Sequence, residues 1–186
     1  MWGAVGNRFD EIFERIAAPL RRARPGEGKR EFSIRTVVVG VMIGLTVLSA
    51  LERSTGNLLV IGSFGASSIL LFAVPDSEFA QPWNVVGGHV LSSIVGLLAY
   101  KITGGAWWGI GPTVGIALWL MLATKSLHPP AGADPIIMIA RQSADVLFVT
   151  TTVLLGTTVL VLLATAWHSR VTGLTFPDEE QRKVRP

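Results

Sequence analysis

The sequence predicts an all-α protein, a polytopic bundle of transmembrane helices. Of its 186 residues, 49% are hydrophobic and only 16% are charged, whereas soluble domains carry about 25% charged residues. The charges also gather at the two ends of the chain, before residue 34 and after residue 167, so the middle is nearly free of them. A chain with this pattern is expected to cross a lipid bilayer several times.

The two ends are predicted to lie outside the membrane domain. Residues 1–33 are interpreted as an N-terminal amphipathic cytoplasmic helix and a basic linker, because apolar residues recur at helical spacing: Phe9, Ile12, Phe13, Ile16 and Leu20. Such a helix suits the membrane surface, and packing against another subunit or a soluble partner is the alternative. Residues 34–168 are the predicted transmembrane domain, and residues 169–186 a charged C-terminal tail. The first thirty residues lack the apolar core of a cleavable signal peptide.

Six apolar segments follow one another in the membrane domain. They are Val37–Leu51, Leu58–Val74, Asn84–Tyr100, Trp107–Thr124, Pro135–Ala140 and Val146–Trp167. Because a helix needs about 20 residues to cross the hydrocarbon core, the fifth segment is too short on its own. Gly62, Gly65 and neighbouring serines also interrupt the second. The sequence therefore allows six spans, or four if these two segments only dip in. Both counts leave the termini on one side, which their basic residues place in the cytoplasm.

An internal repeat relates the two interrupted segments. Gly65–Ala73 aligns without gaps on Gly132–Ala140. Before each copy lies an apolar helix with a glycine pair suited to close helix contact, and after each copy lies another long helix; the pairs are Gly40 with Gly44 and Gly111 with Gly115. This indicates two halves of three segments, inverted if all six cross. Repeats with interrupted middle segments indicate a transport site, since a half-helix N-terminus attracts anions.

Several short motifs resemble a known family. His128-Pro129-Pro130-Ala131-Gly132-Ala133 occurs together with Gly62-Ser63-Phe64-Gly65-Ala66-Ser67, Ala80-Gln81-Pro82-Trp83-Asn84 and Gly88-His89, in that family's order. Over roughly residues 34–167 the chain is similar to the HPP family of integral membrane proteins, named for the His-Pro-Pro motif. Members in plastids and cyanobacteria are associated with nitrite transport. The resemblance implies transport of a small anion, with nitrite as the leading candidate.

The predicted anion path consists of polar and small residues of the interrupted segments and their neighbours: Ser63, Gly65, Ala66, Ser67, Ser68, Asn84, His89, Lys125, His128, Pro129, Pro130, Ala131, Gly132 and Ala133. His128 is interpreted as an anion ligand or pH gate, or else as a hinge residue that caps its neighbours. His89 is a functional candidate or makes an interhelical hydrogen bond. Lys125 offers a positive charge or reaches to the interface. We expect Asp134 to cap the following half-helix, and Gln81 and Asn84 to cap the third helix.

Other functions are less well supported by the sequence. Ser67 or Ser68 with His89 or His128 provides the residue types of a hydrolase, but no Gly-x-Ser-x-Gly motif accompanies them, so we expect no enzyme. Cysteine is absent and the histidines are scattered, so neither a metal nor a cofactor is expected. The flanking charges favour membrane lipids over nucleic acid. The expected partners are a small anion, lipids and further copies of the chain, in the cell inner (plasma) membrane. A non-transporting scaffold or sensor is the alternative.

Overall fold

The computed structural model describes residues 34–55, 62–141 and 145–177, and every regular element in these ranges is a helix. This confirms the predicted all-α class. The predicted N-terminal amphipathic helix lies outside the described residues. All statements below refer to the described part of the chain.

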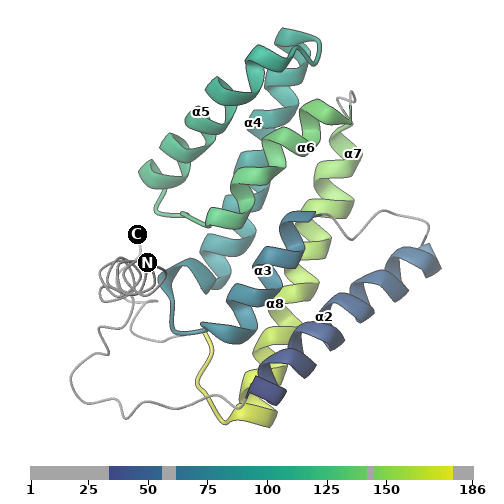
Figure 1. Ribbon diagram of the computed structural model, residues 1–186, viewed down its shortest axis with the longest axis vertical. Coiled ribbons are helices and arrows are strands. Elements are labelled where there is room, and N and C mark those ends of the chain that lie inside the picture. Colours follow the sequence, from purple (N-terminus) through teal and green to yellow (C-terminus); the bar gives the residue numbers. More distant parts are fainter. Residues whose placement is uncertain (1–33, 56–61, 142–144, 178–186) are drawn as a thin grey trace, which may run out of the picture. The chain divides into compact units, whose positions relative to one another are not determined.

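Each of the six predicted apolar segments corresponds to a helical segment (Figure 1). Two of them are single helices, α2 and α3, and a short 3₁₀ turn, η1, follows α3. Others combine an α-helix with π- or 3₁₀-helical turns, and the sixth is continuous from residue 146 to residue 172. Their bounds are α2 Ile34–Thr55, α3 Gly62–Ala73, η1 Glu78–Ala80, η2 Trp83–Gly87 with α4 Gly88–Thr103, η3 Trp107–Gly109 with α5 Ile110–Ala123, η4 Pro129–Ala133 with α6 Asp134–Ala140, and α7 Val146–Phe148 with η5 Val149–Leu155, α8 Gly156–Trp167 and η6 His168–Thr172.

The segments differ in whether they are long enough to cross a membrane. Three helices have the length and composition of a span: 34–54, 83–103 and 146–172. By contrast, α3 has 12 residues and α6 has 7. At about 1.5 Å per residue, α3 covers about 18 Å of a hydrocarbon core about 30 Å thick. The second and fifth segments are therefore half-helices, as the interrupted sequence predicts.

The contacts between helices repeat when the two halves of the chain are exchanged. In this comparison α2 is equivalent to α5, α3 to α6 and α4 to α8. Each contact in one half then has an equivalent contact in the other: α2–α3 corresponds to α5–α6, α2–α8 to α5–α4, and α3–α8 to α6–α4. Two contacts join equivalent segments of the two halves, α3 with η4 and α4 with η5, because η4 continues into α6 and η5 continues into α8. The exchange leaves these two contacts unchanged. Figure 1 shows α3 and α6 running in opposite directions. The fold is thus two inverted three-segment repeats, as predicted.

Close helix packing depends on glycine at some of the predicted positions but not at others. A Cβ on Gly40 would lie 2.6 Å from a ring carbon of Phe72, and one on Gly44 would lie 3.1 Å from the same ring, so the first glycine pair does serve close contact. The prediction is wrong for the second pair within this chain. Gly111 and Gly115 are exposed, with no described atom within 4 Å of a Cβ placed there.

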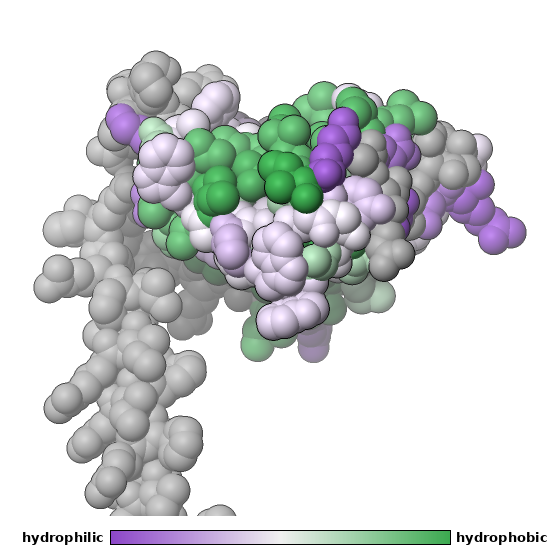
Figure 2. Space-filling view, turned by 90° about the horizontal axis from the view of Figure 1, so that it is seen from above, coloured by the Kyte–Doolittle hydropathy of each residue, from purple (hydrophilic) through white to green (hydrophobic). Residues whose placement is uncertain are grey.

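The outward surface is strongly apolar. Large hydrophobic side chains are exposed along α2, α5 and the sixth segment, among them Ile34, Met42, Trp119, Leu122 and Leu147. Figure 2 shows patches of such residues on the face seen from above. Soluble monomers rarely expose contiguous apolar patches of this kind, whereas lipid tails cover them at no cost. The surface therefore agrees with a membrane-embedded bundle.

Candidate functional site

Five polar side chains meet in the interior, where the two half-helices approach each other. Ser63 and Ser67 lie on one face of α3, one turn apart; His89 lies on α4; His128 immediately precedes η4; and Asp134 is the first residue of α6. Each of the five is at most 2% exposed. We call this group the polar cluster. A buried polar group is stable only if its hydrogen bonds are satisfied, so the partners of each atom are informative.

Asp134 is the acceptor at one end of the polar cluster. Its Oδ1 accepts from the Ser63 hydroxyl at 2.7 Å, and its Oδ2 lies 2.6 Å from His89 Nδ1 and 3.2 Å from the Ser93 hydroxyl. Two hydroxyls donate to this carboxyl group and an imidazole nitrogen lies beside it, and such partners suit an ionised carboxylate. The expectation that Asp134 caps its own half-helix is wrong, because the carboxylate bonds to side chains of α3 and α4 instead.

Ser67 links the two imidazoles at the other end. Its Oγ lies 2.8 Å from His89 Nε2, 2.8 Å from His128 Nε2 and 3.0 Å from the Ser63 carbonyl oxygen. His128 Nδ1 lies 2.7 Å from the carbonyl oxygen of Phe79. A carbonyl only accepts, so this Nδ1 carries a hydrogen. The chain of hydrogen bonds therefore runs from Asp134 through His89 and Ser67 to His128.

Local sequence holds the His128 segment against the cluster. The segment approaches α4 at Gly88, where an added Cβ would lie 2.9 Å from both His128 Cβ and the Ser126 carbonyl oxygen. The Asn84 amide donates to the Leu127 carbonyl at 2.8 Å, and therefore fixes the backbone just before His128. The two prolines that follow occupy the first turn of η4, where a missing N–H costs nothing.

The structure separates the predicted path residues into distinct groups. Ser63, Ser67, His89 and His128 belong to the polar cluster. Gly65, Ala66 and Ser68 lie on α3, and the Ser68 hydroxyl donates to the carbonyl of Gly65; Pro129, Pro130, Ala131, Gly132 and Ala133 form η4. Asn84 lies within the third helix and not at its N-terminal boundary, whereas Gln81 immediately precedes the helix and its carbonyl accepts from the Val85 N–H at 3.0 Å. The Gln81 amide donates to the carbonyls of Pro75 and Ser77.

Lys125 lies apart from the polar cluster. It is exposed and has a left-handed backbone, φ 52°, in the turn that ends α5. Two side chains of the site were not on the predicted path, Asp134 and Ser93. A signal for Asp134 was present, since it is the only acidic residue between residues 79 and 144. A lone carboxylate within an apolar membrane domain is by default a functional candidate.

Ser67, His89 and Asp134 have the spacing of a nucleophile, a base and an orienting acid. One feature sets them apart from a catalytic triad: the Ser67 Oγ is also held by a second imidazole, that of His128. Serine, two imidazoles and a carboxylate in series are also suited to binding and passing protons, because each group both donates and accepts or changes its charge.

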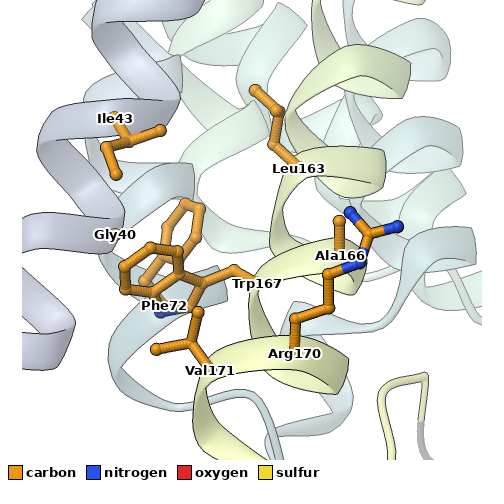
Figure 3. A pocket seen from close by; sticks show the side chains of 8 residues that line it. All are labelled: Gly40, Ile43, Phe72, Leu163, Ala166, Trp167, Arg170 and Val171. Atoms are coloured by element: carbon orange, nitrogen blue, oxygen red, sulfur yellow. The ribbon is translucent and has the colours of Figure 1, made fainter.

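A second feature, an apolar hollow of about 200 Å³, lies between α2 and the end of the sixth segment (Figure 3). Phe72, Trp167 and Val171 line it together with Gly40, Ile43, Leu163, Ala166 and Arg170. None of the five cluster residues lines it. It is therefore a surface hollow separate from the polar cluster.

Comparison with known proteins identifies the class to which this fold and site belong. Residues 29–177 match the family model described as HPP, transmembrane region. The chain therefore belongs to the HPP transmembrane family, as the motifs indicate. No solved structure matches the chain.

Two curated relatives come from Dictyostelium discoideum, and each is named only as a transmembrane protein. One is 31% identical over 125 residues, which cover 63% of this chain and 44% of the relative. The other is 37% identical over 109 residues, which cover 52% of this chain and 34% of the relative. The chain thus matches less than half the length of each. Membrane location follows from these comparisons and from the apolar helices, whereas the names of the relatives state no substrate.

Proposed function

We propose that this protein transports a small inorganic anion, with nitrite the leading candidate, across the cell inner (plasma) membrane. The observation that carries the proposal is the polar cluster itself, which joins the two half-helices of an inverted repeat through the 2.7 Å bond between Ser63 and Asp134. Binding sites of transporters with inverted repeats lie where discontinuous helices meet. In this proposal both termini are cytoplasmic and the protein catalyses no chemical reaction.

The surroundings of the cluster support a binding site for a small polar solute. Hydroxyl and imidazole groups are concentrated there, while the rest of the interior is mainly apolar. The N-terminal turns of α3 and α6 contribute Ser63 and Asp134, so the positive ends of two helix dipoles meet beside the cluster. The hydroxyl and imidazole groups can donate hydrogen bonds to an anion, while the Asp134 carboxylate is paired with His89.

The complete burial of the cluster favours a carrier over an open channel. Ser67, His89 and His128 each have 0% exposure, so no water-filled path reaches them in the described state. A site enclosed between two inverted repeats is what an occluded state presents, and rocking of one repeat against the other then opens it to either side. Lys125, which was expected to line the path, is exposed and lies outside the closed cluster.

Flux into proteoliposomes tests the proposal. Liposomes that contain the purified protein are expected to take up nitrite faster than protein-free liposomes, whose uptake measures the leak of neutral nitrous acid. Nitrate provides a second probe without that leak. We expect His128→Gln to slow uptake at equal protein insertion, because it removes an imidazole of the cluster. His168→Gln is the matched control, since His168 is equally buried but bonds to Leu71 and Thr172 outside the cluster.

Liposomes that hold folded protein and stay impermeable to nitrite, nitrate, formate and chloride at several pH values would overturn the proposal in favour of a scaffold. Equal loss of uptake in both histidine variants would indicate damage to the fold instead of a specific site. Assembly into a homo-oligomer stays a prediction, which chemical cross-linking in native membranes checks.

A further inference from the structure

The polar cluster is one hydrogen short if both of its imidazoles are neutral and Asp134 is ionised. His128 Nδ1 donates to the Phe79 carbonyl, and His89 Nδ1 then donates to the Asp134 carboxylate. A neutral imidazole with a hydrogen on Nδ1 has only a lone pair on Nε2. Both Nε2 atoms lie 2.8 Å from Ser67 Oγ, which has a single hydrogen. One of these two short contacts would then join two lone pairs and be repulsive.

One added proton completes the hydrogen bonds. With a proton on His89 Nε2, this imidazolium donates to Ser67 Oγ, and the Ser67 hydroxyl donates to His128 Nε2. His89 is the imidazole to carry the charge, because it contacts the Asp134 carboxylate whereas His128 faces a neutral carbonyl. The charges of Asp134 and His89 then cancel. A neutral cluster is also the state that a dry interior favours.

The geometry accommodates a second proton as well. If His128 Nε2 is protonated too, both imidazoles donate to Ser67 Oγ, which has two lone pairs to accept them. The Ser67 hydroxyl then donates to the Ser63 carbonyl oxygen, a hydrogen bond of 3.0 Å in the structure. Rotation of one hydroxyl therefore serves both states with little movement of heavy atoms. The doubly protonated cluster carries one net positive charge.

An anion that enters this centre needs a positive charge beside it. The described lysines and arginines are all exposed, at positions 35, 53, 101, 125, 141 and 170. The polar groups in contact with the two imidazoles are Ser67 from α3, Asp134 from α6 and the Phe79 carbonyl from η1, and Asp134 in turn accepts from Ser63 and Ser93. None of these is a cation. A proton on the second imidazole is thus the available compensation.

We infer that the polar cluster is a proton-binding site that holds one proton at rest and takes up a second with each transported anion. The second step rests on the proposed function, and it makes transport an electroneutral symport of one proton with one monovalent anion. On release, the anion leaves to the other side, the second proton follows it, and the Ser67 hydroxyl returns to His128.

Proton movement during anion uptake tests the coupling. Proteoliposomes that contain a pH-sensitive dye are given an inward nitrate or nitrite gradient. We expect the interior of the proteoliposomes to acidify faster than that of protein-free liposomes, by one proton for each anion taken up. The initial rate of anion uptake is expected to be the same when valinomycin and potassium make the membrane potential positive or negative. Anion uptake without acidification, at a rate that follows the potential, would overturn the coupling and leave anion transport itself intact.

A measurement without any anion tests the first proton. Nitrogen-15 spectra of histidine-labelled wild-type protein are expected to show one imidazolium in the cluster near pH 7, assigned to His89 with the variants His128→Gln and His168→Gln. Asp134→Asn is expected to abolish it, because the amide supplies a hydrogen to His89 Nδ1 and the network closes without an added proton. Two neutral cluster imidazoles beside an ionised Asp134 in folded wild type would refute the count. If Asp134→Asn does not fold, the wild-type spectrum alone decides.

Discussion

Replacement of Asp134 separates the charge of this carboxylate from its role as a hydrogen-bond partner. Asp134→Ala leaves three donors without an acceptor in the interior: Ser63 Oγ, Ser93 Oγ and His89 Nδ1. Removal of one member of a buried charged pair costs about 3–5 kcal/mol of stability. We therefore expect the free energy of unfolding of the alanine variant to fall by about that amount.

Asp134→Asn is expected to cost less. The side-chain amide can donate to His89 Nδ1 while its oxygen still accepts from Ser63, if the imidazole carries its hydrogen on Nε2 instead. Hydrogen bonds to charged groups contribute about 1.5–3 kcal/mol and neutral ones about 0.5–1.5 kcal/mol, so the expected cost is about 1–2 kcal/mol. The difference between the two variants measures how much of the role of Asp134 is hydrogen bonding.

Reversible unfolding by sodium dodecyl sulfate in mixed micelles, followed by circular dichroism, gives these free energies. Ser92→Ala is the matched control, because the Ser92 hydroxyl is fully buried but has no hydrogen-bond partner among the described residues. Its loss is expected to change stability by less than about 0.5 kcal/mol or to raise it. If Asp134→Ala costs no more than this control, or if the alanine and asparagine variants cost the same, the hydrogen-bond network as described is wrong.

Three glycine substitutions test packing around the cluster. Gly96→Ala places a Cβ 2.7 Å from Pro135 Cα and must push α4 from α6, so the same unfolding assay should show a loss of about 1–3 kcal/mol. Gly111→Ala, on the exposed face of α5, should instead raise stability by up to about 1 kcal/mol, and a loss there would indicate an unseen contact. Gly88→Ala should displace His128 and slow nitrite uptake by at least about tenfold, equivalent to about 1.4 kcal/mol, whereas unchanged uptake would show that the position of His128 does not matter.

The sequence was sufficient to predict the helices because lipid leaves few alternatives to an apolar helix. Trp107–Thr124 was predicted and the structure has η3 and α5 over 107–123. The first segment was predicted as Val37–Leu51, whereas α2 runs from Ile34 to Thr55. The difference arises because polar residues at the membrane interface continue a helix although they end its apolar run. For the residues that the structure describes, the sequence therefore predicts the number of helical segments but not their lengths.

The partners in the polar cluster were less predictable than the helices. Ser63 and Asp134 are 71 residues apart and meet only because the two half-helices approach each other with their N-termini. Sequence patterns report which residues share a helix face, but not which faces meet across the bundle. Asp134 was interpreted as a local cap for that reason. Lys125 was interpreted either as a charge on the anion path or as a lysine at the interface, and its exposed position in the turn after α5 agrees with the second interpretation.

The internal repeat explains why Asp134 and Ser67 belong to one site. In the alignment of Gly65–Ala73 with Gly132–Ala140, the third positions are Ser67 and Asp134. Inverted repeats bring equivalent positions of their middle segments together, and His89 bridges these two, with Nε2 at Ser67 and Nδ1 at Asp134. The two halves therefore place a hydroxyl on one side of the imidazole and a carboxylate on the other. This chemical difference between equivalent positions gives a symmetric fold an asymmetric chain of hydrogen bonds. The carboxylate holds a proton on His89 at one end, whereas His128 at the other end can gain or lose one.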